Sequence, residues 1–361
     1  MTLQRSALHH IATAAGTDFQ ESYGWELPTA YTDVAAEYQA VTKGVAVYDA
    51  SYMGRLKVSG DDALDLLNRL STNKVDELQT GHGAPTILTT DRGRILDLII
   101  VLKLDDYVLL LTSPGLQQPV IEFLDKYTIM EDLVVEDISA STALLAVWGP
   151  DGQGTLESVI GEDLAELSLY DSVERELAGS SVRIVSTQIS QLSRYYIIAP
   201  NEAAPAVWQS IVEAGALPIG AEAFESARVT YSLPVHGREM GDEFNPLETG
   251  LIGSIDFAKG CYIGQEVIAR LDTYQKVQKY LVRLAFEPGA TVSPGTALMQ
   301  EGKAVGKVTS VATVPTTGDI IGLAYVRTKQ AVTGARLELE PPATGWAMIQ
   351  DLPQLFGPGE G

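Results

Sequence analysis

The spacing of apolar and polar residues divides most of the chain into short helices and strands. Apolar residues at helical spacing predict helices at 33–43, 61–72, 115–127, 155–161, 203–216 and 221–231. Runs rich in Val, Ile and Leu predict strands at 45–52, 54–60, 84–90, 94–104, 107–112, 133–139, 142–149, 181–188 and 194–200. This mixture of element types predicts an α+β fold for the first 280 residues.

Local signals indicate how some of these elements begin, end and pair. Asp33 is an N-cap residue for the first of the helices. Residues 91–93 separate two strand runs as a hairpin turn. The alternating patterns of 45–52 and 54–60 predict paired strands. Residues 17–31 contain glycine and proline without a regular period, so we expect a loop there.

The pattern changes after about residue 280. Short apolar runs, separated by Pro-Gly, Gly-Lys and Thr-Gly turns, follow one another to the end of the chain. Such spacing is typical of a small all-β barrel or sandwich. The sequence therefore predicts two regions, an α+β region at 1–280 and a small C-terminal all-β barrel at 281–361.

The most apolar stretch, residues 95–111, is not expected to cross a membrane. Asp97 and three further charged residues interrupt it, and it reads as two strands with a turn between them. The first 16 residues contain one Arg and no sustained apolar run, which is unlike a secretory signal peptide.

Charge and composition narrow the classes of function. The chain carries 25 Lys and Arg against 47 Asp and Glu, a net charge of -22. That balance argues against binding to nucleic acid or to anionic membranes and favours a cytoplasmic protein whose acidic residues are spread over solvated faces. A single Cys excludes an internal disulfide framework, and the four His residues show no metal-ligand spacing, so we expect no metal site.

The segment 259–266, KGCYIGQE, contains that one Cys. Glycines on both sides of Cys261 allow a sharp turn of the backbone. The nearby Lys259 would favour the thiolate form of Cys261 and so raise its reactivity. The alternative is a buried, inert thiol.

Several segments together resemble a known family. The chain is similar to the glycine-cleavage T-protein superfamily of folate-dependent aminomethyltransferases in the segments GWELPTAY, DASYMGRLKVSGDDA, RGRILDLIIV and LPVHGREMGDEFNPLETGL. Within it, KGCYxGQE resembles the signature of YgfZ-type folate-binding proteins, which are implicated in maintaining iron–sulfur enzymes; T-proteins usually have Asp in place of Cys261. The resemblance implies a clover-leaf arrangement of α+β lobes and a C-terminal β-barrel around a folate channel.

The resemblance also implies roles for individual residues. Asp97 matches a carboxylate beside the reacting folate nitrogen, where it could hold or relay a proton. The alternative is a strand-edge acid paired with Arg92 or Arg94. Tyr196 stands where T-proteins carry a pterin-binding Glu, so it could stack on the pterin but lacks the carboxylate. Its alternative is that Tyr195 and Tyr196 simply alternate between core and surface.

Three further positions complete the expected site. Arg228 suits the carboxylates and carbonyl of folate, or else bonds Glu225 or a backbone carbonyl at a helix end. Glu248 either caps the following turn, which we favour, or lines the channel. Tyr262 follows the cysteine and is expected to line the folate site. The expected catalytic residues are Cys261, Asp97 and Lys259; the expected folate contacts are Asp97, Tyr196, Arg228, Glu248 and Tyr262.

The sequence leaves three functions to weigh. The first hypothesis is a tetrahydrofolate-binding protein of the YgfZ type, with Cys261 as its key thiol and iron–sulfur proteins as partners. The second is a folate-dependent aminomethyltransferase, with a lipoyl carrier protein as partner, or a related demethylase. The third is a non-enzymatic module that uses its acidic surface to bind a protein. The cofactor expected for the first two is a reduced folate, and the one-carbon donor stays open.

Overall fold

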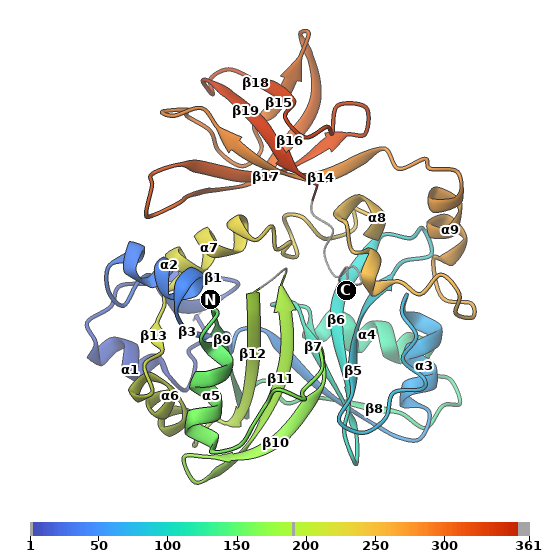
Figure 1. Cartoon of the computed structure of the whole chain (residues 1–361). Coiled ribbons are helices and arrows are strands. Elements are labelled where there is room, and N and C mark those ends of the chain that lie inside the picture. Colours follow the sequence, from blue (N-terminus) through green and yellow to red (C-terminus); the bar gives the residue numbers. More distant parts are fainter. Residues whose placement is uncertain (1–2, 190–191, 353–361) are drawn as a thin grey trace. The chain divides into compact units, whose positions relative to one another are not determined.

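A computed structural model describes residues 3–189 and 192–352, which divide into two compact units (Figure 1). Unit 1 comprises Met1–Arg69, Asn73–Thr86 and Leu98–Phe224. Unit 2 comprises Leu70–Thr72, Ile87–Asp97 and Glu225–Gly361. Unit 2 includes short stretches from the N-terminal half of the chain. The two units therefore divide the chain differently from the predicted regions 1–280 and 281–361.

Most elements lie within one unit. Unit 1 contains α1 (His9–Ala14), β1 (Phe19–Ser22), β2 (Trp25–Pro28), α2 (Val34–Lys43), β3 (Ala46–Asp49), β4 (Gly54–Ser59), β7 (Val108–Thr112), α4 (Gln117–Tyr127), β8 (Val134–Asp137), β9 (Thr142–Trp148), α5 (Gly152–Ile160), β10 (Ser172–Leu177), β11 (Ser180–Ile189), β12 (Leu192–Pro200), α6 (Ala204–Glu213) and β13 (Leu217–Pro218). Unit 2 contains α8 (Pro246–Thr249), the short 3-10 helix η1 (Ile252–Ser254), α9 (Gln265–Thr273), β14 (Lys279–Phe286), β15 (Ala297–Gln300), β16 (Lys303–Thr313), β17 (Ile320–Arg327), β18 (Arg336–Leu339) and β19 (Trp346–Asp351). Elements that run from one unit into the other are α3 (Ala63–Leu70), β5 (Gly83–Thr89), β6 (Ile95–Lys103) and α7 (Ala221–Thr230).

One sheet of unit 1 has the strand order β10-β11-β12-β9-β3-β13. Its neighbours are antiparallel except for β13 and β3, which run parallel. Helices α5 and α6 contribute Leu156, Val207 and Trp208 to the core that covers one face (Figure 1). Burial of this apolar surface stabilises the unit and fixes which face of each strand points inward.

A second sheet has the order β5-β6-β7-β4-β8. Strands β6 and β7 are antiparallel, as are β7 and β4, and β4 and β8. The prediction that 45–52 pairs with 54–60 is wrong, because β3 and β4 belong to different sheets. Local alternation shows that each segment is a strand, but it carries no information about the partner strand.

The expected loop at 17–31 is also wrong, since β1 and β2 form an antiparallel hairpin there. The two residues between the strands are Tyr23 and Gly24, with φ of 55° and 79°. A positive φ at both positions of a two-residue turn matches the twist of the flanking strands. Tyr is uncommon at such a position, so the sequence carried only half of the usual turn signal.

The C-terminal strands of unit 2 form a closed barrel in the order β14-β17-β16-β15-β18-β19. Its core contains Val282, Leu284, Val308, Ala324 and Val326, each from the inward face of its strand. The predicted α+β fold followed by a small all-β barrel is therefore confirmed. The sequence pattern missed β19, the strand that completes the barrel.

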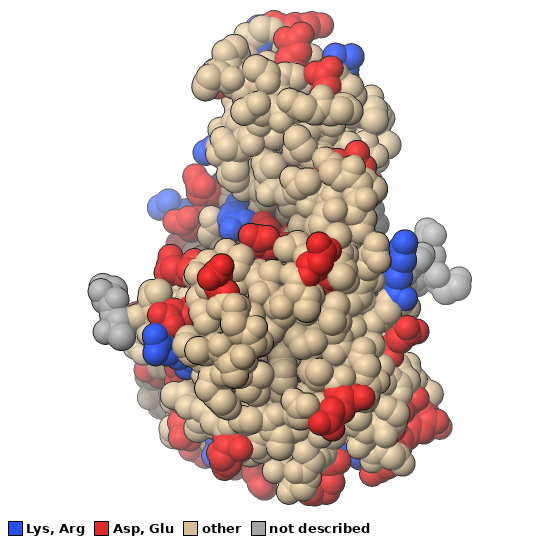
Figure 2. All heavy atoms as spheres, turned by 90° about the vertical axis from the view of Figure 1, so that its left-hand side faces the viewer, with Lys and Arg blue, Asp and Glu red and all other residues tan. Residues whose placement is uncertain are grey.

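The surface reflects the excess of acidic residues. On the face drawn in Figure 2, Asp and Glu side chains are scattered among uncharged residues without forming a single patch. No helix in the described parts of the chain combines the length and the apolar character needed to cross a bilayer.

Candidate functional site

The loop that contains Cys261 is held against the turn between β5 and β6. Gly264 has φ +83°, and a Cβ at this position would lie 2.6 Å from the carbonyl oxygen of Thr90. The hydroxyl of Thr89 donates a hydrogen bond to the carbonyl of Ile263 at 2.5 Å. Since only glycine tolerates both this backbone conformation and this close approach, Gly264 determines how the loop packs. Helix α9 then begins at Gln265.

Lys259 is buried within unit 2. Its ammonium group donates a hydrogen bond to the carbonyl of Ser71 at 2.9 Å and lies 5.5 Å from the centroid of the Tyr262 ring. A cation above an aromatic face is attracted by the ring quadrupole. These contacts anchor the loop at its start, as Gly264 does at its end. The expectation that Lys259 activates the thiol stays a prediction.

Between these two anchors, Cys261 is an exposed free thiol, so the alternative of a buried, inert thiol is wrong. The next side chain, Tyr262, is buried, and burial raises its pKa to about 12. Among residues 3–189 and 192–352, no three His, Cys, Asp or Glu side chains gather closely enough to hold a metal ion. The loop therefore exposes the thiol of Cys261 to solvent and buries the side chain of Tyr262.

Asp97 lies on β6 and is fully buried. It shares the inward face of that strand with Ile95 and Ile99, which are also buried. A carboxylate in an apolar row is costly to desolvate, so such a group is a candidate for function. The neighbouring Arg94 contacts the carbonyl of Glu243 at 3.2 Å and the carboxylate of Glu248 at 3.6 Å.

Glu248 caps helix α8, which is the role that the sequence favoured. Its carboxylate accepts a hydrogen bond from the backbone N–H of Asn245 at 3.2 Å, while the Asn245 side chain accepts from the N–H of Glu248 at 3.0 Å. This reciprocal capping box satisfies two helix-end donors. Burial raises the pKa of Glu248, against the opposing attraction of Lys279 and Arg94.

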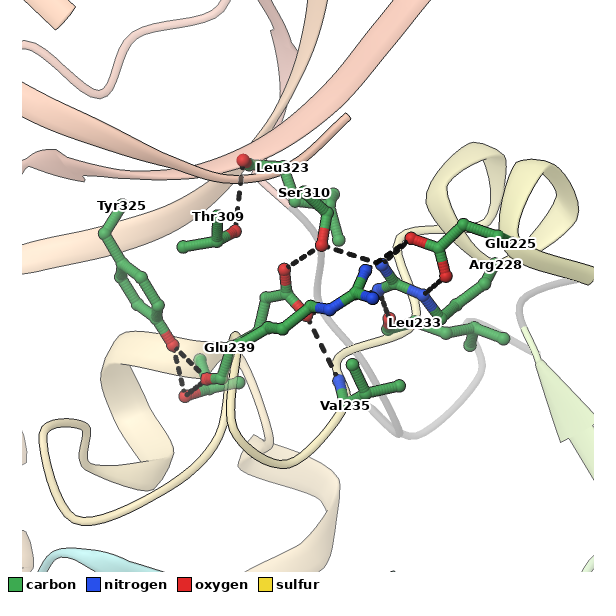
Figure 3. A network of polar contacts seen from close by, with 11 residues as sticks. Glu225, Arg228, Leu233, Val235, Glu239, Thr309, Ser310, Leu323 and Tyr325 are labelled. Carbon is green, nitrogen blue, oxygen red and sulfur yellow. Dashed lines mark hydrogen bonds and ion pairs between the residues drawn. The ribbon is translucent and has the colours of Figure 1, made fainter. Parts of the chain in front are cut away.

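Arg228 lies at the centre of a buried polar network (Figure 3). Its guanidinium donates to both carboxylate oxygens of Glu225, at 2.8 and 2.6 Å, and to the carbonyl of Leu233 at 2.7 Å. It also donates to Glu239 at 3.2 Å and to the hydroxyl of Ser310 at 2.7 Å. All five guanidinium N–H groups therefore have partners.

The network of Arg228 has two consequences. The alternative foreseen for this residue, bonding to Glu225 and to a backbone carbonyl, is what the structure shows. Ser310 also donates to Glu239 at 2.6 Å, so helix α7, the loop that follows it and barrel strand β16 are joined by charge-assisted hydrogen bonds. Direct folate contact by Arg228 stays a prediction, and it would require one of these bonds to be given up.

Tyr196 belongs to unit 1, whereas the other expected site residues belong to unit 2. Both Tyr195 and Tyr196 are buried, so the alternative in which one of them faces solvent is wrong. Tyr196 lies on β12 opposite Ala146 of β9, and Tyr48 of β3 lies opposite the same alanine. The two tyrosines therefore share one face of the sheet. The guanidinium of Arg194 lies 4.6 Å from the Tyr196 ring centroid.

The sequence reasoning missed an aromatic cluster on this face of unit 1. Tyr48 stacks on Phe224 with ring centroids 4.4 Å apart, and Tyr23 stacks on Tyr52 at 5.6 Å. Burial raises the pKa of Tyr52 well above its ordinary value, with further effects from Tyr48 and Tyr196. The sequence signal for this cluster was the pair Tyr48 and Tyr52 in the segment AVYDASY. The alternation of apolar and polar residues gives no indication that Phe224 lies beside them.

Comparisons with known proteins identify the family. The model of the GCVT N-terminal domain matches residues 8–259, and the model of the glycine cleavage T-protein C-terminal barrel domain matches residues 279–348. Aminomethyltransferases of Picosynechococcus sp. and Thermotoga neapolitana are 28% and 29% identical, with 94% of each chain covered. A chloroplastic protein of Arabidopsis thaliana, whose name describes a transferase, is 33% identical over 88% of this chain and 72% of its own.

A solved structure shows the same fold. The crystal structure of glycine cleavage system aminomethyltransferase T from Bartonella henselae superposes with a TM-score of 0.87 over 98% of both chains, at 22% identity. The names of the two bacterial relatives agree better with the aminomethyltransferase alternative than with the iron–sulfur role of the first hypothesis. With both domain models matched in order along its length, the chain belongs to the glycine cleavage T-protein family.

Proposed function

We propose that the protein binds tetrahydrofolate and transfers a one-carbon group to it, as a folate-dependent aminomethyltransferase. The observation that carries the proposal is the alignment of relatives named aminomethyltransferases over 94% of both chains. The two domain models, matched at 8–259 and 279–348, support it further. A lipoyl carrier protein is then the expected donor of the aminomethyl group.

Asp97 is the proposed catalytic residue. Transfer of the aminomethyl carbon from the lipoyl sulfur to tetrahydrofolate passes through a cationic, iminium-like centre. It forms bonds from the carbon to weakly basic folate nitrogens, breaks the carbon–sulfur bond and the bond to the amino nitrogen, and releases the lipoyl thiol and ammonia. A carboxylate beside a folate nitrogen can accept its proton and stabilise the positive charge. The burial of Asp97 supports this role, because a carboxylate acts more strongly on a nearby cation where water is excluded.

The other residues expected at the site suit a reduced folate only in part. Tyr196 and Tyr48 offer aromatic faces on one side of a sheet, which suits the flat pterin ring. Arg228 and Glu248 are already committed to the network and to the capping box, so we assign them a structural role within unit 2. The carboxylate that would bind the pterin amino group is replaced by Tyr196, so we expect weaker folate affinity than in a protein with Glu there.

The experiment is to incubate the purified protein with tetrahydrofolate and an aminomethylated lipoyl carrier protein, and to measure methylene-tetrahydrofolate. Asp97→Asn should lower the rate by roughly 10²–10⁴, the usual contribution of a positioned acid–base group. Asp105→Asn is the matched control, because Asp105 lies exposed in the turn after the same strand. No product from the unaltered protein at high concentration would overturn the proposal.

One observation favours a second candidate, the YgfZ-type role. Cys261 is an exposed thiol on a loop anchored at both ends, by Lys259 and Gly264. In this reading the protein binds tetrahydrofolate, and Cys261 supports iron–sulfur enzymes. In a strain that lacks the gene, Cys261→Ala should fail to restore iron–sulfur enzyme activity while its folate binding persists. Full restoration by Cys261→Ala would remove the support for this candidate.

A further inference from the structure

A cavity of about 590 Å³ lies within unit 2, outside the barrel wall. One side is the outer face of strands β14, β16 and β17, and the other is the loop that contains Arg238, Glu243 and Phe244. The volume lies within the range of about 300–1,000 Å³ that is usual for small-molecule sites. None of the residues assigned to the proposed function lines this cavity.

The lining of the cavity is unusually basic for this chain. Lys279, Lys307 and Arg327 line it from three neighbouring strands, and Arg238 lines it from the loop. Glu243 is the one acidic residue among the described residues that line it. Because the chain as a whole carries 47 acidic and 25 basic residues, this reversal of the local balance creates a positive site on an acidic protein.

Carboxylates offset only part of the positive charge at this cavity. Lys279 and Arg327 lie directly opposite each other on the antiparallel strands β14 and β17, where like charges repel. Arg238 pairs with Glu225 at 2.6 Å. Burial lowers the pKa of Lys279, and attraction by Glu248 and Glu243 opposes that shift, so these two carboxylates offset part of its charge.

Two stacked rings form a rigid part of the wall beside these charges. The rings of Phe244 and Tyr325 are 4.1 Å apart and nearly parallel. The ammonium of Lys279 lies 4.3 Å from the first centroid and 4.9 Å from the second. The Tyr325 hydroxyl donates to the carbonyl of Glu239 at 2.6 Å and is bonded to Thr249 at 2.7 Å, and Figure 3 shows it directed away from the barrel into that loop. These contacts hold the ammonium of Lys279 beside the two rings.

Strand geometry sets the spacing of the charges. Lys307 lies opposite Tyr325, and Arg327 is two residues further along β17 on the same face, opposite Lys279. Adjacent strands are about 4.8 Å apart, so long side chains from β14, β16 and β17 can reach separate anionic groups of one small molecule. Lysine acts as a point charge and arginine as a planar fork, and both recognise carboxylate and phosphate.

We propose that this cavity binds a small polyanion with two or more carboxylate or phosphate groups, through Lys279, Lys307 and Arg327. Such a ligand would relieve the repulsion between Lys279 and Arg327 and would find a preformed aromatic wall beside its charges. The site is separate from Cys261 and Asp97 in its residues, and the proposal does not depend on the aminomethyltransferase activity.

The experiment is calorimetric titration of the full-length protein at low ionic strength, with inorganic pyrophosphate in one arm and citrate in the other. We expect saturable one-site binding that weakens as salt is added. Lys307→Gln combined with Arg327→Gln should weaken binding by about tenfold or more, because hydrogen bonds to charged groups contribute substantially to affinity. The stronger of the two arms identifies whether phosphate or carboxylate is preferred.

The matched control is Lys303→Gln combined with Lys329→Gln, which removes the same charge at two exposed positions, the first residue of β16 and a residue just after β17, that do not line the cavity. This variant should bind as the unaltered protein does. Thermal unfolding of both double variants checks that they fold. The proposal is overturned by the absence of saturable binding of both probes at millimolar concentration, or by equal affinity in the cavity variant and the control.

Discussion

Gly264 shows how much of the site depends on a single backbone position. Its φ of +83° and the nearby carbonyl of Thr90 leave no room for a side chain. Gly264→Ala should therefore lower the free energy of unfolding by on the order of 1–3 kcal/mol, through strain and a displaced loop. Denaturant unfolding measures this loss.

Gly260 provides the control for that substitution. A Cβ at Gly260 would meet no atom within 4 Å, although the residue lies in the same loop. Gly260→Ala should leave stability unchanged or raise it slightly by restricting the unfolded chain. Equal losses in the two variants would mean that the close approach of Gly264 to the β5–β6 turn is unimportant.

Glu248 leads to a prediction about pH. Burial raises its pKa above the ordinary value of 4.5, so the folded state binds this proton more tightly than the unfolded state. The contribution of this group to stability is then fully present below pH 4.5 and is lost as pH rises through the raised pKa. Glu248→Gln, which cannot ionise, should gain stability relative to the unaltered protein across that interval.

The measurement is urea unfolding of both proteins in a series of buffers from acid to neutral pH. The difference in unfolding free energy should change in the weakly acid range and level off above the raised pKa. The opposite slope, with the variant losing stability as pH rises, would show that attraction by Lys279 and Arg94 outweighs burial.

The candidate site also shows which properties of single residues a sequence can predict. The cap formed by Glu248 was predictable, because both partners of a capping box lie within four residues. The exposure of Cys261 was not predictable, and neither was the finding that every guanidinium N–H of Arg228 has a hydrogen-bond partner. One partner of Arg228, Ser310, lies 82 residues away, and no local pattern connects the two.

At the scale of elements, two positive charges that face each other on β14 and β17 should destabilise the barrel. Lys279 and Arg327 are direct cross-strand partners, and such pairs influence stability by about 0.2–1 kcal/mol. Arg327→Gln should raise the free energy of unfolding by a similar amount at low ionic strength. The gain should shrink in high salt, where the repulsion is screened.

Lys329→Gln is the control for this variant, since Lys329 is exposed and lies outside the strands. It should change stability less than Arg327→Gln in low salt, as measured by thermal unfolding at two ionic strengths. A loss of stability in Arg327→Gln that persists in high salt would mean that the arginine packs favourably and that repulsion is minor.

Helices and strands were predictable where the pattern is strong, and their partners were not. Helix α2 begins where Asp33 caps it, with a bond to the N–H of Ala36 at 3.0 Å. Strands β6 and β7 lie on either side of the expected turn. By contrast, β3 and β4 are close in sequence but lie in different sheets, because their partners β9 and β7 come later in the chain. Pairing is decided by tertiary packing, which alternation within one strand does not encode.

At the scale of the whole molecule, the net charge of -22 should make stability depend on salt. Repulsion among scattered acidic residues opposes the compact state. The free energy of unfolding should therefore rise between about 10 and 150 mM NaCl, as the Debye length falls from about 30 to about 8 Å. The affinity for a polyanion in the cavity lined by Lys279, Lys307 and Arg327 should instead fall over the same range of salt concentration.

Denaturant unfolding with urea, which adds no ions, is the suitable measurement, and sucrose of matched osmolality is the control. A fall in stability with NaCl would show that attractive ion pairs, such as Arg283 with Asp351 at 2.5 Å, outweigh the general repulsion.

The overall fold class was predictable at this scale, because the change in the pattern of apolar runs near residue 280 separates the barrel from the α+β region.

The anchoring of the Cys261 loop also has a consequence for how the protein is made. The hydrogen bond from Thr89 to Ile263 spans 174 residues, and the bond from Lys259 to Ser71 spans 188. A ribosome that adds about 5–20 residues per second delivers Ile263 roughly 10–35 s after Thr89. During that interval the β5–β6 turn exists without its final neighbours, so the thiol-bearing loop can take its shape only after Ile263 has been added.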